Sequence, residues 1–227
     1  GRDTSVDNNL VGSWPNLSAS FRDWQGLWFK PGADGMLSNI NFSFAGKGFV
    51  VPPFALPVSQ AVRIDNADVV ISDSIFTDNG QTALFSKDTS TTIVRSQFSR
   101  GDRALESENS VLHISDSSFD SFTNSRGPLF IKDKWPLLQN ISYQNNTPNM
   151  PYLEGVNIVN QTAIMSESEN YLVHALKVSS TGVLYIQPDV SVYLPVFGII
   201  EVGGSLQALG TAQKPINFLP YPASVNW

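Results

Sequence analysis

Four consecutive segments of the chain end in the same way at a nearly constant interval. Each closes on an aromatic residue and carries an aliphatic residue five positions earlier. The aromatic residues, which are 22, 21 and 24 positions apart, are Phe76, Phe98, Phe119 and Tyr143. The aliphatic residues are Ile71, Ile93, Ile114 and Leu138. A period near 22 carried by short β-branched runs is typical of one coil of a parallel β-helix, in which like residues stack on like.

Residues 182–218 repeat this interval. Gly182 and Gly204 are 22 apart, as are Leu184 and Leu206, so they predict two more coils. We therefore expect an all-β, single-stranded, right-handed parallel β-helix of about eight to ten coils, with roughly 22 residues in each. Residues 1–227 are expected to form one such domain.

Composition supports this fold class and excludes some functions. The 227 residues are 41% hydrophobic and only 15% charged, with 14 Pro and 16 Gly, which favours an all-β chain with many turns. The net charge of −6 and scattered basic residues predict no nucleic-acid partner. There is no cysteine and no apolar run long enough to span a bilayer, so contact with a membrane is expected only through parts of the protein outside these residues.

A polar position follows two residues after each aliphatic one. It holds Asp73, Arg95, Asp116 and Asn140, which places an arginine between two carboxylates of neighbouring coils. One interpretation is an acidic and basic groove that carries chemistry. The favoured interpretation is an ion-pair ladder at a turn, where alternating charge avoids like-charge stacking. The charged run at 100–108 is interpreted in the same way, as a solvated turn.

The segment 47–60 interrupts the coils with three prolines, which remove ladder donors, so it predicts a loop insertion. One interpretation is a flap over the surface of the helix. The other is a contact site for another chain, made by the apolar residues Phe49, Val50, Val51, Phe54 and Leu56.

No catalytic constellation is found. The chain lacks Asp-Asp, His-Gly and Arg-x-Lys, and His113 and His174 sit in strand patterns that favour surface positions. No calcium loop, metal-ligand spacing or phosphate-binding glycine loop occurs, so no cofactor or metal is expected. The alternative function is a carbohydrate-binding or polysaccharide-cleaving β-helix, for which Trp135 is the nearest candidate platform. The favoured interpretation of Trp135 is packing against the loop that follows it.

Five Asn-x-Ser/Thr triplets are candidate N-glycosylation sites, against about three expected by chance from composition. They begin at Asn16, Asn41, Asn140, Asn145 and Asn160. This mild excess favours an extracellular eukaryotic protein over a secreted bacterial one.

The coil residues also resemble a known family. The pattern G-x-L-x-I-x-P-x-V-x-V is followed by G-x-L-x-A-x-G-T and P-I-x-F, with W-x-G-L-x-F near the start. These residues are Gly182, Leu184, Ile186, Pro188, Val190 and Val192, then Gly204, Leu206, Ala208, Gly210, Thr211, Pro215, Ile216 and Phe218, with Trp24, Gly26, Leu27 and Phe29. The pattern is similar to right-handed parallel β-helix repeats of the pectate-lyase-like superfold, and among extracellular proteins it most resembles the insect bark beetle (Anakonda) family.

The resemblance implies a function. That family has a large single-pass ectodomain of β-helix units separated by scavenger-receptor cysteine-rich domains, and it builds tricellular septate junctions. We therefore expect a non-catalytic structural or adhesion module at cell junctions. Its partners would be other proteins or copies of itself, bound through the rod faces or the 47–60 loop. The echo of residues 19–24 in residues 223–227 favours an excerpt of a longer multidomain ectodomain.

Overall fold

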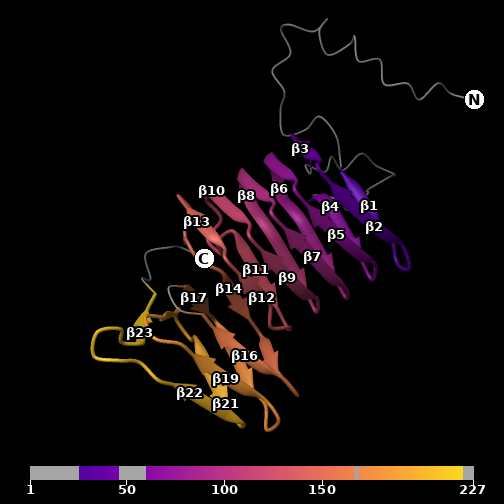
Figure 1. The fold of residues 1–227 in the computed structure, drawn as a ribbon. Helices are drawn as coiled ribbons and strands as arrows, with labels where there is room; N and C mark the ends of the chain where they lie inside the picture. Colours follow the sequence, from indigo (N-terminus) through magenta and orange to yellow (C-terminus); the bar gives the residue numbers. More distant parts are fainter. Residues whose placement is uncertain (1–25, 46–59, 167–168, 222–227) are drawn as a thin grey trace, which may run out of the picture.

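The computed structural model describes residues 26–45, 60–166 and 169–221, and every regular element in them is a β-strand. All strand pairs are parallel. The chain is a β-solenoid with roughly 22 residues per turn. The described residues make about seven turns, against the eight to ten expected for the whole chain. Figure 1 shows the turns stacked along one axis, with the strands of successive turns side by side.

The strands form four sheets. The largest contains β1 (Leu27–Phe29), β3 (Asn41–Ser43), β4 (Gln60–Asp65), β6 (Ile75–Lys87), β8 (Gln97–Glu108), β10 (Ser118–Phe122), β11 (Leu129–Lys132), β13 (Ser142–Gln144), β14 (Tyr152–Glu154), β17 (Asn170–Val173), β20 (Ser191–Leu194) and β23 (Asn217–Pro220). A five-stranded sheet contains β2 (Asp34–Ser38), β5 (Asp68–Ser72), β7 (Ser90–Val94), β9 (Val111–Ser115) and β12 (Leu137–Gln139). The two three-stranded sheets contain β15 (Val156–Ile158), β18 (Ala175–Val178) and β21 (Ile199–Val202), and β16 (Thr162–Met165), β19 (Val183–Ile186) and β22 (Ser205–Ala208).

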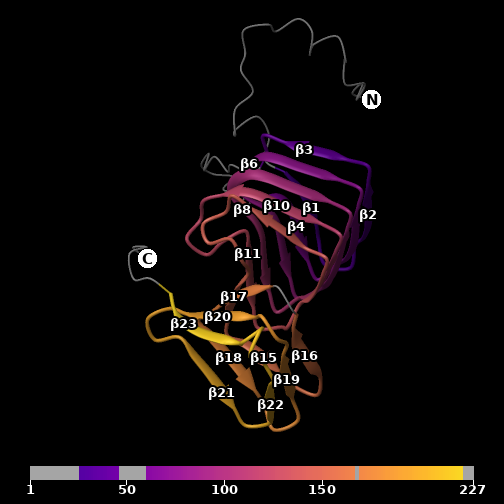
Figure 2. The same ribbon diagram turned by 60° about the vertical axis from the view of Figure 1, so that its left-hand side comes forward.

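The first turns have a three-sided cross-section, seen obliquely in Figure 2. The long strands β6 and β8 bend, with a register shift in their pairing between Asn79 and Thr82. Their first halves lie in one face with β3, β10 and β13. Their second halves lie in another face with β4 and β11. The five-stranded sheet is the third face.

The cross-section changes partway along the rod. The face that begins at β1 continues without a break through β14, β17, β20 and β23. The five-stranded sheet ends at β12, and the two three-stranded sheets take the place of the other two faces (Figure 1). The solenoid is therefore two stacks of turns that share one sheet. The two coils expected in residues 182–218 belong to the second stack, where Leu184 pairs with Leu206 in register.

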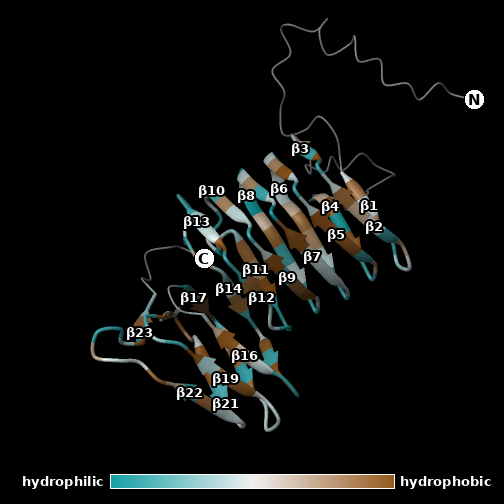
Figure 3. Cartoon of the chain, viewed as in Figure 1, coloured by the Kyte–Doolittle hydropathy of each residue, from teal (hydrophilic) through white to brown (hydrophobic). Residues whose placement is uncertain are grey.

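Alternate residues of each strand point into the core, so hydrophobic and hydrophilic residues are interleaved along the strands in Figure 3. The aromatic residues at the 22-residue step form one column inside the first stack. The rings of Phe76 and Phe98 stack with centroids 4.6 Å apart, and those of Phe98 and Phe119 with centroids 5.2 Å apart. Phe42 and Tyr143 extend the column at its two ends, at 5.0 and 5.8 Å. Burying each ring contributes about 1.5–3 kcal/mol.

The aliphatic residues form a second column beside the rings. Ile71, Ile93 and Ile114 are register partners on adjacent strands and are at most 1% exposed. Leu37, the register partner of Ile71, and Leu138, the register partner of Ile114, extend the column at its two ends. These two columns account for the constant five-residue spacing, because the two residues of each pair lie on either side of the same corner.

Each corner of the three-sided coil requires a residue with positive φ. Three columns of such residues run along the rod, and most of their members are asparagine or aspartate, which adopt the left-handed conformation at least cost. The columns are Asn39, Asp73, Arg95, Asp116 and Asn140; Phe44, Asp78, Arg100, Ser121 and Asn145; and Asn66, Asp88, Asn109 and Asp133. The recurrence of Asn and Asp every turn is therefore a backbone requirement.

Candidate functional site

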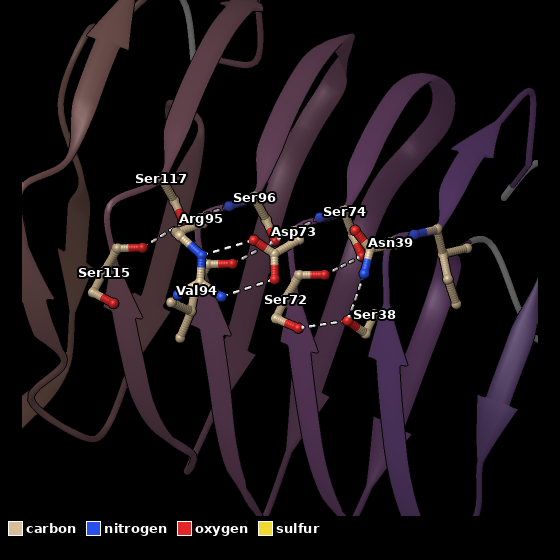
Figure 4. Close-up of polar contacts among 11 residues, drawn as sticks. Ser38, Asn39, Ser72, Asp73, Ser74, Val94, Arg95, Ser96, Ser115 and Ser117 are labelled. Carbon is tan, nitrogen blue, oxygen red and sulfur yellow. Dashed lines mark hydrogen bonds and ion pairs between the residues drawn. The ribbon is translucent and has the colours of Figure 1, made fainter.

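The polar ladder of Asp73, Arg95, Asp116 and Asn140 lies at the corner between the five-stranded sheet and the aromatic face. All four residues have φ between 47° and 52°. Arg95 donates from Nε and Nη2 to the two carboxylate oxygens of Asp73, at 2.7 and 2.8 Å (Figure 4). Asn140 donates from Nδ2 to Asp116 at 2.8 Å. The ladder therefore forms two pairs, and the arginine is not shared equally between two carboxylates.

The electrostatics of this pair follow from its geometry. The hydrogen bond from Arg95 holds the pKa of Asp73 below its ordinary value, and the same bond raises the pKa of Arg95. Both side chains are exposed to water, at 59% for Arg95 and 35% for Asp73. An exposed ion pair of this kind contributes little stability. Because the guanidinium is already bonded to a carboxylate, the ladder offers no free cation for chemistry.

The same arrangement recurs at the next corner. Arg100 donates from Nε and Nη2 to Asp78, at 2.8 and 2.6 Å, and this bond lowers the pKa of Asp78. At the third corner, Asn109 donates from Nδ2 to Asp88 at 2.7 Å. The same side-chain pairing between neighbouring turns recurs at all three corners, which identifies this pairing as a feature of the coil. The structure therefore brings the predicted ladder residues together, and they lie at a turn.

A serine ladder lies one residue beyond the polar ladder, and the sequence interpretation missed it. The hydroxyl of Ser96 accepts from the backbone N–H of Ser74 at 3.3 Å and donates to the carbonyl of Val94 at 3.0 Å. The hydroxyl of Ser117 likewise accepts from the backbone N–H of Ser96 in the preceding turn, at 3.1 Å, and donates to the carbonyl of Ser115 (Figure 4). Each hydroxyl thus satisfies a buried backbone donor where the strand ladder breaks at the corner. The signal was the recurrence of serine at 74, 96 and 117.

The charged run at 100–108 is not wholly a solvated turn, so that interpretation was wrong for Arg103. Arg103 is only 9% exposed, and burial lowers its pKa. Its guanidinium donates to Glu106 and, at 2.9 Å, to Asn124 of the following turn. It also lies 4.9 Å from the ring centroid of Phe130. The following turn covers this arginine, which sequence-local reasoning could not show.

A cleft of about 420 Å³ lies further along the shared sheet, on the outside of the solenoid. Its lining includes Arg126, Tyr152, Glu154, His174 and Phe197. The rings of Tyr152 and His174 are nearly parallel, with an interplanar angle of 15° and centroids 6.4 Å apart. Burial raises the pKa of Tyr152 to about 12. His174, predicted to be a plain surface histidine, borders this cleft.

Trp135 is packed and does not form the carbohydrate platform of the alternative interpretation. Trp135 is 5% exposed, and its ring stacks on that of Tyr171 with centroids 6.3 Å apart. Tyr171 in turn donates to Glu169 at 2.7 Å, and burial raises the pKa of that carboxyl. The tryptophan packs where the five-stranded sheet ends and cannot present a face to a ligand. His113 lies on the outer side of β9, beside Thr92 and Leu137 of the neighbouring turns.

The remaining predicted residues fall in two groups. Asn16 and the loop residues Phe49, Val50, Val51, Phe54 and Leu56 lie outside the described residues. The other four glycosylation candidates, Asn41, Asn140, Asn145 and Asn160, are exposed.

In the described ranges, no group of three or more His, Cys, Asp or Glu side chains is placed to hold a metal ion. The same ranges contain no helix of the length and hydropathy needed to cross a membrane.

The fold and its corner ladders define the class of this molecule, a parallel β-solenoid protein. Comparison with known proteins takes the assignment no further: no family model, no curated protein and no solved structure matches this chain. The resemblance to the bark beetle family rests on the residues of the coil repeats alone.

Proposed function

We propose that this chain is a non-catalytic structural and adhesion module of an extracellular surface protein, and that it binds a second copy of itself through the outer face of the five-stranded sheet. A solenoid suits this role because each turn is bonded to the next along several sheets, which makes a stiff rod. The serine and polar ladders add side-chain bonds along the same axis.

The observation that carries the proposal is a row of apolar side chains on the outer face of the five-stranded sheet. Met36 pairs in register with Val70, and Leu137 occupies the equivalent position on β12. These three residues are 75%, 39% and 48% exposed. Val111, on the same face of β9, is 38% exposed. Exposed apolar residues gathered on one face favour association with another chain.

A second copy of the chain fits this face because it presents the same apolar residues, so two faces can meet about a two-fold axis, the commonest symmetry of protein dimers. Thr92 and His113 interrupt the apolar row. We therefore expect reversible association, with a dissociation constant on the order of micromolar.

Extracellular location and a place at tricellular junctions are parts of the same proposal. They rest on the resemblance to bark beetle repeats and on the sequons. The four described sequon asparagines are exposed, so glycans at these positions would extend into solvent. Secretion from insect cells followed by glycosidase treatment tests this part, and we expect a loss of mass that corresponds to glycans at these asparagines. A secreted protein whose mass does not change would contradict it.

Sedimentation velocity over a range of protein concentrations tests the association. Val70→Lys places a charge on this face, and Ile164→Lys is the matched control, because Ile164 is 46% exposed on β16 of a different sheet. We expect the sedimentation coefficient of the wild type and of Ile164→Lys to rise with concentration, and that of Val70→Lys to stay at the monomer value. A monomeric wild type, or equal loss in both variants, would overturn the proposal.

A further inference from the structure

The cleft on the outer side of the shared sheet is built from four successive turns. Arg126 precedes β11, Glu154 ends β14, His174 follows β17, and Phe197 lies in the turn between β20 and β21. The backbone fixes their relative positions: the N–H of His174 donates to the carbonyl of Leu153 at 2.9 Å, and the carbonyl of His174 accepts from Ile199 at 3.0 Å. The cleft is therefore part of the rigid coil.

Phe197 is the least expected residue of the cleft. It is 90% exposed, and its φ of 64° lies in the left-handed region that bulky residues avoid. It occupies the third position of a turn closed by the bond from the Gly198 N–H to the Pro195 carbonyl at 2.7 Å, where glycine or asparagine is favoured. A large apolar ring held in water on a strained backbone stabilises nothing in the fold. Strain of this kind is concentrated at ligand sites.

Three polar side chains converge on the same cleft. No ion pair or side-chain hydrogen bond of Arg126, Glu154 or His174 is found among the described residues. The guanidinium of Arg126 rests on the ring of Phe130, with its carbon 4.6 Å from the centroid, which orients its donors. The cleft therefore offers a charged donor, a charged acceptor, and an imidazole that both donates and accepts.

We propose that this cleft is a saccharide-binding site, in which Phe197 packs against the apolar face of a sugar ring. Sugar hydroxyls both donate and accept, so one ring can bond to a guanidinium, a carboxylate and an imidazole together. A simple anion would be opposed by Glu154, and a simple cation by Arg126. A purely apolar ligand would leave all three polar groups desolvated without partners. The volume of about 420 Å³ falls in the ordinary range for small-ligand sites.

Saturation-transfer NMR with a fixed panel of free oligosaccharides tests the proposal. The panel contains chito-, cello- and xylo-oligosaccharides, oligogalacturonides, sialyllactose and a heparin hexasaccharide. We expect at least one of them to bind the wild type. Phe197→Gly should weaken that binding at least tenfold, and Arg126→Gln should weaken it as well. Tyr185→Ala is the control, because Tyr185 is an exposed aromatic residue, at 38%, on β19 of a different sheet.

Phe197→Gly also separates loss of the site from loss of the fold. Glycine adopts a positive φ readily, so this variant should melt no lower than the wild type while it loses the sugar. Failure of the whole panel to bind at millimolar concentration would overturn the proposal. Full binding by Phe197→Gly, or equal weakening in Tyr185→Ala, would also overturn it. None of these outcomes bears on association through the five-stranded sheet, which involves different residues.

Discussion

Replacement of Phe98 by alanine tests the aromatic column, which is the most regular feature of the fold. Phe98 is 1% exposed, and its ring lies between those of Phe76 and Phe119, with centroids at 4.6 and 5.2 Å. Loss of a buried phenylalanine costs about 3–5 kcal/mol, because the transfer free energy and the cavity both count. We therefore expect Phe98→Ala to lower the free energy of unfolding by about that amount.

A leucine at the same position divides this cost into two parts. Phe98→Leu keeps most of the apolar burial but loses both ring contacts, each worth about 0.5–1.5 kcal/mol. Its expected cost is therefore about 1–3 kcal/mol. Urea denaturation followed by circular dichroism measures both variants, with Val70→Ala on the outer side of β5 as a control expected to change stability by less than about 0.5 kcal/mol. A cost below about 1.5 kcal/mol for Phe98→Ala, or no measurable cost for Phe98→Leu, would refute the stacked column.

Three further predictions concern the corners and the cleft. Ser96→Ala leaves a buried backbone N–H without its acceptor and should lower the free energy of unfolding by about 1–3 kcal/mol. The control Ser72→Ala, at a more exposed hydroxyl, should change the free energy of unfolding by less than about 0.5 kcal/mol. Equal effects of the two variants in urea titrations would contradict the serine ladder. Phe197→Gly removes a strained φ that costs about 1–3 kcal/mol, but it adds backbone entropy to the unfolded chain worth about 0.5–1 kcal/mol. Thermal melts should therefore show an unchanged or raised melting temperature. A lower melting temperature would count against strain at Phe197. Arg95 lowers the pKa of Asp73 below its ordinary 3.8, so this ion pair stabilises the fold above pH 3.8, and its contribution is lost as the pH falls through the pKa of Asp73 in the folded state. The free energy of unfolding, measured against pH, should therefore fall less steeply on acidification in Arg95→Gln than in the wild type. Identical slopes would exclude an effect of Arg95 on Asp73.

The period and the core columns could be predicted from the sequence because they depend on spacing alone. Ile71 and Phe76 lie on either side of one corner, and the next turn repeats them 22 residues later as Ile93 and Phe98. Stacking in register then follows from the parallel pairing. The serine ladder follows the same rule, and its spacing was visible in the sequence.

Other features depend on contacts between turns that no local pattern reports. After β12 the chain leaves the five-stranded sheet and forms new sheets, which changes the cross-section. The repeats before and after this point have the same length, so their spacing does not reveal the change. Arg103 looks solvated beside its charged neighbours, but Asn124 and Phe130 from the following turn cover it. The cleft joins Arg126 to Phe197, which are 71 residues apart and follow no common repeat.

Hydrogen–deuterium exchange at low and high protein concentration tests the account most directly, because it locates any association along the rod. The account predicts that protection gained on concentration is confined to β2, β5, β7, β9 and β12, whose outer face carries exposed apolar residues. Protection that instead appears at residues 199–220, or no change with concentration, would contradict it.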